Sequence, residues 1–174
     1  MQQLVKKRKA IALIFIVLMI ISRFIILAGT GWANFSPVIV MSLFAGYYFT
    51  LSEALLVTFI GVTLSNIVVN NTFYSQWFDG FSWAINVHTV LFLCITLMTR
   101  VIKNKITSNI ISVLFFFICS NFLVYLTGQY GYGWSALIEC YYFALPFLKN
   151  TLLSNAFFGL VMFRSEEHTS ELQS

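Results

Sequence analysis

Six long apolar stretches, separated by short polar segments, constrain this chain more than any other feature of its sequence. They occupy residues 10–29, 37–49, 54–69, 81–99, 106–127 and 134–163. Only 9% of the residues are charged, whereas about a quarter of a soluble domain is charged. Apolar helices of about 20 residues suit a bilayer core of about 30 Å, although the stretch 37–49 is short for one unless residues 34–36 lie within it. The sequence therefore predicts an all-α, polytopic membrane protein with six transmembrane helices.

Basic residues gather on one side of the predicted membrane. Residues 6–9 are all Lys or Arg, and Arg100, Lys103 and Lys105 follow the fourth stretch, while the outer loops carry none. The positive-inside rule then places the N-terminus on the cytoplasmic side of the membrane. Topology and anionic lipids explain these charges, so we predict no nucleic-acid partner. A signal peptide is the alternative, but the first apolar run continues past Arg23 without a small-residue cleavage site.

The last residues have a different character from the rest of the chain. Residues 164–174 read Arg-Ser-Glu-Glu-His-Thr-Ser-Glu-Leu-Gln-Ser directly after an apolar helix. This segment resembles the translation of a common sequencing-library adapter, so we expect it to be an artefact outside the fold. The predicted domain is then residues 1–163, with the genuine C-terminus missing.

The two prolines mark places where we expect the helical backbone to be interrupted. Ser36 is suited to N-cap a helix with Pro37 in its first turn. Pro146 lies inside the sixth apolar stretch and predicts a break there. Interrupted helices are typical of binding sites in transporters, so we expect the two interruptions to face each other. Thr50 and Glu53 match a capping box at the start of the third helix.

Apart from Glu139, which is expected at the outer interface, three side chains that can carry a charge fall inside the predicted spans. Arg23 lies close to the helix start at Ser36, where unpaired N–H groups would help to bind an anion. Lys149 follows the predicted break at a similar depth. The alternative for both cations is that they extend to the headgroups at the membrane surface. For His88 a hydrogen-bonded structural role competes with a ligand or proton-relay role.

The candidate binding site combines these cations with nearby amides and a hydroxyl. Its predicted ligand-binding residues are Arg23, Asn34, Ser36, Asn121, Lys149 and Asn150. Two cations in the outer half favour an anionic or carboxylate-bearing solute. The sequence contains no paired carboxylates inside a span, no nucleophile elbow and no phosphate loop, and its three cysteines lack metal-ligand spacing. We therefore predict no enzyme activity, no metal and no cofactor.

An ordered set of short segments also resembles a known group of proteins. The segments are Arg23, residues 34–37, 43–47, 115–122, 140–147 and 150–152. Together they resemble a family of small bacterial membrane proteins assigned to transport and similar to the substrate-binding S components of energy-coupling-factor transporters. The resemblance implies a six-helix fold with an outward-facing pocket, and a membrane scaffold subunit and ATPases as partners. The chain departs from that pattern at Asn66, where an acidic residue is usual, and at Ala10 and Ala12, which lack the Ala-xxx-Ala spacing of the scaffold contact.

These observations lead to two functional hypotheses. In the first, the protein sits in the lipid bilayer, binds a small solute from outside and takes part in its transport. In the alternative, it is a structural or interaction protein whose polar side chains only bridge helices, with interactions worth about 0.6 kcal/mol each on average.

Overall fold

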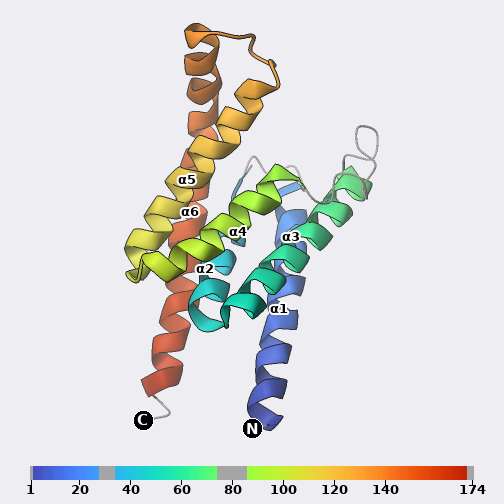
Figure 1. The fold of residues 1–174 in the computed structure, drawn as a ribbon, viewed down its shortest axis with the longest axis vertical. Coiled ribbons are helices and arrows are strands. Elements are labelled where there is room, and N and C mark those ends of the chain that lie inside the picture. Colours follow the sequence, from blue (N-terminus) through green and yellow to red (C-terminus); the bar gives the residue numbers. More distant parts are fainter. Residues whose placement is uncertain (1, 28–33, 74–85, 172–174) are drawn as a thin grey trace.

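The secondary structure of the described residues is entirely helical. The computed structural model describes residues 2–27, 34–73 and 86–171, with side chains described for 10–23, 34–72 and 86–164. These ranges contain α1 (Gln2–Leu27), α2 (Val38–Tyr48), α3 (Leu51–Phe73), α4 (Val87–Val101), α5 (Lys105–Leu126) and α6 (Trp134–Glu171), and no strand. Helix α1 begins and α6 ends at the same end of the molecule, and the α5–α6 connection lies at the opposite end (Figure 1). The prediction of an all-α fold is confirmed.

The helices differ in their suitability for crossing a membrane. Within the described residues, two segments are both long and apolar enough, Leu51–Thr72 of α3 and Lys105–Leu126 of α5. Helix α2 has 11 residues, or about 16 Å of helix, and α4 has 15, or about 22 Å. Both are shorter than a bilayer core of about 30 Å. Six complete crossings therefore remain a prediction, and residues 74–85, which include the expected start of the fourth span, lie outside the described residues.

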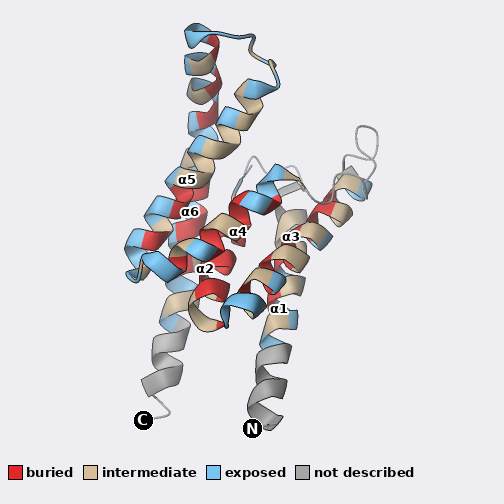
Figure 2. Ribbon diagram, in the orientation of Figure 1, coloured by how far each residue is buried: buried red, intermediate tan, exposed pale blue. Residues whose placement is uncertain are grey.

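Helix α2 lies at the centre of the bundle and contacts every other helix. Most of its residues are buried, among them Val40 and Leu43, which are fully enclosed. Figure 2 shows the buried positions concentrated where α2, α3 and α4 cross, whereas the far half of the α5–α6 pair is mostly intermediate or exposed, with a few buried positions on α6. A helix enclosed by protein does not need to match the bilayer in length, which accounts for the shortness of α2.

Small and hydroxylated residues allow α2 and α4 to approach closely. A Cβ built on Gly46 would lie 2.7 Å from the Thr96 carbonyl oxygen and 2.8 Å from Thr99 Cγ2. Thr96 Oγ1 donates to the carbonyl of Ser42 at 3.3 Å and lies 3.0 Å from Thr58 Oγ1 of α3. These contacts join three helices through hydrogen bonds at a point where the backbones are nearly touching.

Two of the predicted helix starts can be checked directly. Thr50 donates its N–H to Glu53 Oε2 at 3.0 Å, and α3 begins at Leu51, so the Glu53 half of the predicted capping box is confirmed. Helix α2 instead begins at Val38 with Pro37 at the N-cap position. The N-cap is therefore Pro37 and not Ser36, the residue that we predicted. The Ser36 Oγ still accepts the Val38 N–H at 3.4 Å.

The predicted break at Pro146 is wrong, because α6 continues through it. Proline removes one backbone N–H from the helix, but the rest of α6 is held by its neighbours. Before the proline, Tyr141 Oη donates to the Ile118 carbonyl at 2.7 Å. After it, Asn109 Nδ2 donates to the Asn155 carbonyl at 3.1 Å. The Pro146 ring lies on the exposed side of the helix, where it displaces no packed side chain.

Candidate binding cavity

A cavity of about 500 Å³ opens between the ends of the helices remote from the termini. Its lining combines one cation, five asparagines, hydroxyls and several aromatic rings. It is lined by Arg23, Asn34, Asn66, Val69, Asn70, Asn86, His88, Phe92, Phe116, Phe117, Ser120, Asn121, Val124, Tyr130, Cys140, Phe143, Ala144, Phe147 and Thr151. Five helices contribute to it, so the cavity exists only in the folded bundle.

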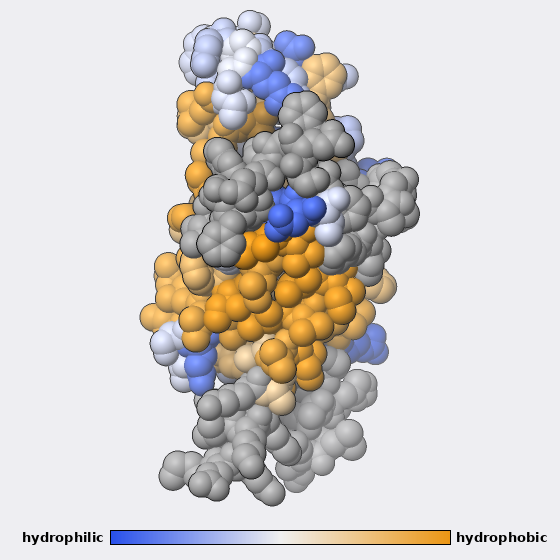
Figure 3. All heavy atoms as spheres, turned by 90° about the vertical axis from the view of Figure 1, so that its right-hand side faces the viewer, coloured by the Kyte–Doolittle hydropathy of each residue, from blue (hydrophilic) through white to orange (hydrophobic). Residues whose placement is uncertain are grey.

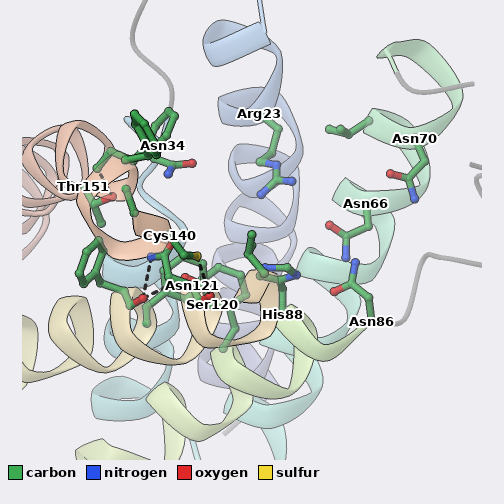
Figure 4. A pocket seen from close by; sticks show the side chains of 18 of the residues that line it. Arg23, Asn34, Asn66, Asn70, Asn86, His88, Ser120, Asn121, Cys140 and Thr151 are labelled. Carbon is green, nitrogen blue, oxygen red and sulfur yellow. Dashed lines mark hydrogen bonds between the residues drawn. The ribbon is translucent and has the colours of Figure 1, made fainter. Parts of the chain in front are cut away.

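One wall is polar and comes from α1, α3 and the start of α4. Arg23 reaches into the cavity from α1, and the His88 ring of α4 is directed toward the same space (Figure 4). Asn66 and Asn70 are four residues apart on α3 and therefore share a face. Asn66 Nδ2 donates to Thr89 Oγ1 at 3.5 Å, which anchors this amide to α4.

Asn86 has a second function beside lining this wall. It N-caps α4, and its Oδ1 accepts the Thr89 N–H at 3.3 Å. An extended residue ahead of a helix commonly caps it in this way. The cap holds the Asn86 amide at the cavity edge, so helix formation positions this lining group.

The opposite wall comes from α5 and α6. Asn121 Nδ2 donates to the Phe117 carbonyl one turn earlier at 2.7 Å, which leaves its second N–H as a possible donor to a ligand and its amide oxygen as a possible acceptor. Cys140 Sγ donates to the Asn121 carbonyl at 3.4 Å and joins α6 to α5 at this level. Thr151 is buried and lines the cavity from further along α6.

Aromatic rings supply the apolar part of the lining. Phe92 and Phe116 are stacked with centroids 5.1 Å apart, and the His88 ring lies 6.1 Å from Phe116. Tyr130 stacks on Phe143 at 6.0 Å near the α5–α6 connection. Flat apolar surfaces beside convergent polar groups are typical of small-molecule sites.

The structure brings together three of the six predicted binding residues. Arg23, Asn34 and Asn121 line the cavity, whereas Ser36, Lys149 and Asn150 do not. Ser36 instead accepts a hydrogen bond through its carbonyl from Ser154 Oγ of α6 at 3.3 Å. Lys149 is exposed on the outside of α6. Among the described lining residues, the permanent positive charge therefore comes from Arg23.

Several lining residues were not among the predicted site residues. They are Asn66, Asn70, Asn86, His88, Ser120 and Thr151, together with the aromatic wall. Asn66 and Asn70 could have been predicted as lining residues, because two amides four residues apart in an apolar helix share one face. The other lining residues come together only when separate helices pack, and residue spacing within one helix does not predict that packing. The described residues contain no group of three His, Cys, Asp or Glu that could hold a metal ion.

Comparison with known proteins gives one match. A protein-family model described as a family of unknown function, DUF6580, matches residues 3–172. No curated protein and no solved structure matches the chain.

Proposed function

This chain belongs to the DUF6580 family, and we propose that it is an integral membrane protein that binds a small anionic solute in the cavity and takes part in its transport. The proposal includes six membrane-associated helices in a bacterial inner membrane, with the N-terminus in the cytoplasm. We also propose that the protein works in the same way as the S components of energy-coupling-factor transporters, with a scaffold subunit and ATPases as partners.

The outer surface of the helices supports the membrane part of this proposal. Only 11% of the apolar window in α5 is buried inside the protein. Large apolar side chains such as Ile110, Ile118 and Phe122 are exposed along that helix. Figure 3 shows a broad hydrophobic band across the middle of the face to which α1 and α3 contribute, with hydrophilic groups toward both ends. Such a band would be costly in water and is expected in contact with lipid.

The end of the molecule that carries the termini supports the predicted orientation. Arg100 Nη2 donates to the Phe49 carbonyl at the end of α2 at 3.1 Å. Lys105 Nζ donates to Tyr48 Oη at 2.6 Å. Both cations therefore lie at the level where α2 ends, on the side that the positive-inside rule assigns to the cytoplasm.

Arg23 in the cavity is the single observation that carries the binding proposal. A charged side chain at membrane depth is costly and commonly marks a functional site. Here it shares a cavity of about 500 Å³ with neutral amides, hydroxyls and aromatic rings. That volume is within the range of about 300–1,000 Å³ typical of ligand sites. An anionic group next to Arg23 and hydrogen bonds to the asparagines would suit this lining.

The first experiment is to identify what the cavity binds. The protein is purified in mild detergent, and co-purifying small molecules are analysed by mass spectrometry. In parallel, its thermal unfolding is followed with a panel of small carboxylates and their uncharged amides. We expect a carboxylate to raise the unfolding temperature and its matched amide to have a much smaller effect.

Arg23→Gln provides the test at the level of one residue. We expect it to weaken binding of the best carboxylate by about tenfold or more, or ~1.4 kcal/mol, because the ion pair is lost. Lys103→Gln removes a cation from the exposed segment between α4 and α5 and is the charge-matched control. An effect of Lys149→Gln as large as that of Arg23→Gln would mean that the site lies elsewhere than in this cavity.

The alternative of a structural or interaction protein also has an observation in its favour. Many polar side chains bond within the bundle, as in the Thr58–Thr96 hydroxyl pair at 3.0 Å. If no solute co-purifies, no member of the panel raises the unfolding temperature, and Arg23→Gln only lowers the yield of folded protein, this alternative replaces the transport proposal.

A further inference from the structure

The faces of α5 and α6 that line the cavity continue beyond it as polar faces. On α5, Phe116 lines the cavity, and Ser112 and Ser108 follow at four-residue spacing toward the termini. On α6, Thr151 lines the cavity and Asn155 follows four residues later. Residues four apart lie on one helix face, so both cavity walls extend in the same direction.

Buried hydrogen bonds connect this extension to the cavity. Asn155 Nδ2 donates to the Thr151 carbonyl at 2.8 Å. Asn109 Nδ2 of α5 donates in turn to the Asn155 carbonyl at 3.1 Å. We call the group Ser108, Asn109, Ser112, Thr151 and Asn155 the polar seam. Asn109 joins it to α6, whereas Ser112 Oγ donates to Met98 Sδ of α4 at 3.8 Å, so α4 borders the seam as well. The seam runs from the cavity to the first turn of α5, near the end of the molecule that carries Lys105.

The polar seam contains more acceptors than the protein itself satisfies. Asn109 Oδ1, Asn155 Oδ1 and Ser108 Oγ are buried and have no hydrogen-bond partner in the structure. Asn155 is only 2% exposed and Ser108 is fully buried. Exchanging the oxygen and nitrogen of either side-chain amide would not satisfy these oxygens. It would remove the hydrogen bond that each nitrogen donates to a backbone carbonyl and place the amide oxygen against that carbonyl. The two amide oxygens therefore need a donor from outside the protein, and the Ser108 hydroxyl needs a donor or an acceptor. Lipid chains can supply neither, whereas water can supply both.

The seam is closed in this structure. A Cβ built on Gly159 of α6 would lie 2.9 Å from Asn109 Nδ2, so the two helices are in close contact. At the same end, Lys105 Nζ lies 5.3 Å from the centre of the Phe163 ring, which joins the start of α5 to α6. A path between these helices would require them to separate at this end.

We propose that the polar seam is the inner half of the solute's path, hydrated when closed and opened toward the cytoplasm when α5 and α6 separate. This inference depends on the proposed transport function, because it adds the route by which a solute leaves the cavity. The side chains that would contact the solute on the way are the amides and hydroxyls of the seam. A purely structural seam would instead stay inaccessible from both sides.

Accessibility of single cysteines tests the path without knowledge of the solute. Cys94, Cys119 and Cys140 are replaced by alanine, and Ser108→Cys or Asn155→Cys is introduced into the full chain. Ala156→Cys is the matched control, because Ala156 is adjacent to Asn155 and exposed on the outer surface of α6. Each protein is treated with a membrane-impermeant maleimide in inverted and in right-side-out membrane vesicles.

We expect Ser108→Cys and Asn155→Cys to react in inverted vesicles about tenfold faster than Ala156→Cys, since water reaches only the seam. Rates as low as that of Ala156→Cys in both vesicle types would overturn the path. So would reaction in right-side-out vesicles alone, because the seam would then belong to the outer cavity. Ser108→Cys is nearly isosteric and keeps the test valid if Asn155→Cys does not fold.

A separate reporter distinguishes failure of this inference from failure of the proposed function. A chain that retains Cys140 alone carries its thiol in the cavity lining. Reaction of Cys140 from the outside, with no reaction in the seam, would leave solute binding intact and remove only the inner path.

Discussion

The effect of a substitution in this bundle depends on which atoms surround the residue. Gly46 and Gly61 are both buried in helices, but a Cβ on Gly46 would meet the Thr96 backbone, whereas one on Gly61 would meet only the Met19 side chain. Met19 is unbranched and can adopt another rotamer. The sequence alone shows two similar glycines, and only the packing of α2 on α4 and of α3 on α1 separates their roles.

We expect Gly46→Ala to destabilise the fold. Alanine is intrinsically better than glycine in a helix by about 0.5–1 kcal/mol, but overpacking against a backbone carbonyl costs about 1–3 kcal/mol. The unfolding temperature in detergent should therefore fall. Gly61→Ala is the matched comparison and should leave that temperature unchanged or slightly raised. Equal effects of the two substitutions would mean that the α2–α4 contact is looser than described.

Single helices show how far local sequence rules extend. The capping box at Thr50 and Glu53 was predictable, because both partners lie within four residues of each other. The break at Pro146 was not, since α6 is held by contacts with α5 on either side of the proline. The face of α6 that Lys149 occupies could not be predicted either. Local sequence places Lys149 on this helix, but which face of α6 meets the cavity depends on the position of α5.

At the level of the element, Glu53→Ala should weaken the start of α3. The substitution leaves the Thr50 N–H without its carboxylate acceptor and also removes the Thr50 Oγ1 bond to Glu53 at 2.8 Å. Loss of a helix cap typically costs about 0.5–2 kcal/mol. Hydrogen exchange of the first amides of α3 should accelerate, and the unfolding temperature should drop. Ser52→Ala, at an exposed position in the same turn, should change exchange much less.

The whole molecule shows what the sequence could and could not predict about the site. Arg23 and Asn121, which line the cavity, could be predicted because polar groups in apolar segments stand out, and Asn34 could be predicted because it lies beside an expected helix start. Asn86 and the aromatic wall were missed, because their shared location results from the packing of helices distant in sequence. Helix α2 was expected as a membrane span, yet it is the central buried helix, and nothing in its apolar sequence separates these two environments.

The proposed topology predicts opposite exposure for the two ends of α5. Lys103 and Gln129 are exposed, one before α5 and one after it. In the cysteine-free chain, Lys103→Cys should react with an impermeant maleimide only in inverted vesicles, and Gln129→Cys only in right-side-out vesicles. Reaction of both from the same side would mean that α5 does not cross the membrane.

The α5–α6 pair projects beyond the other helices at the end remote from the termini (Figure 1). Helix α5 has 22 residues, or about 33 Å of helix, whereas α4 is about a third shorter. In a bilayer, the hydrophobic height of the protein would therefore vary around its perimeter. Lipid would have to thin beside the short helices or the long pair would have to tilt, and each adjustment costs a fraction of a kcal/mol per Å. We expect the protein to respond to acyl-chain length, because thickness would act on the same two helices whose separation opens the proposed path.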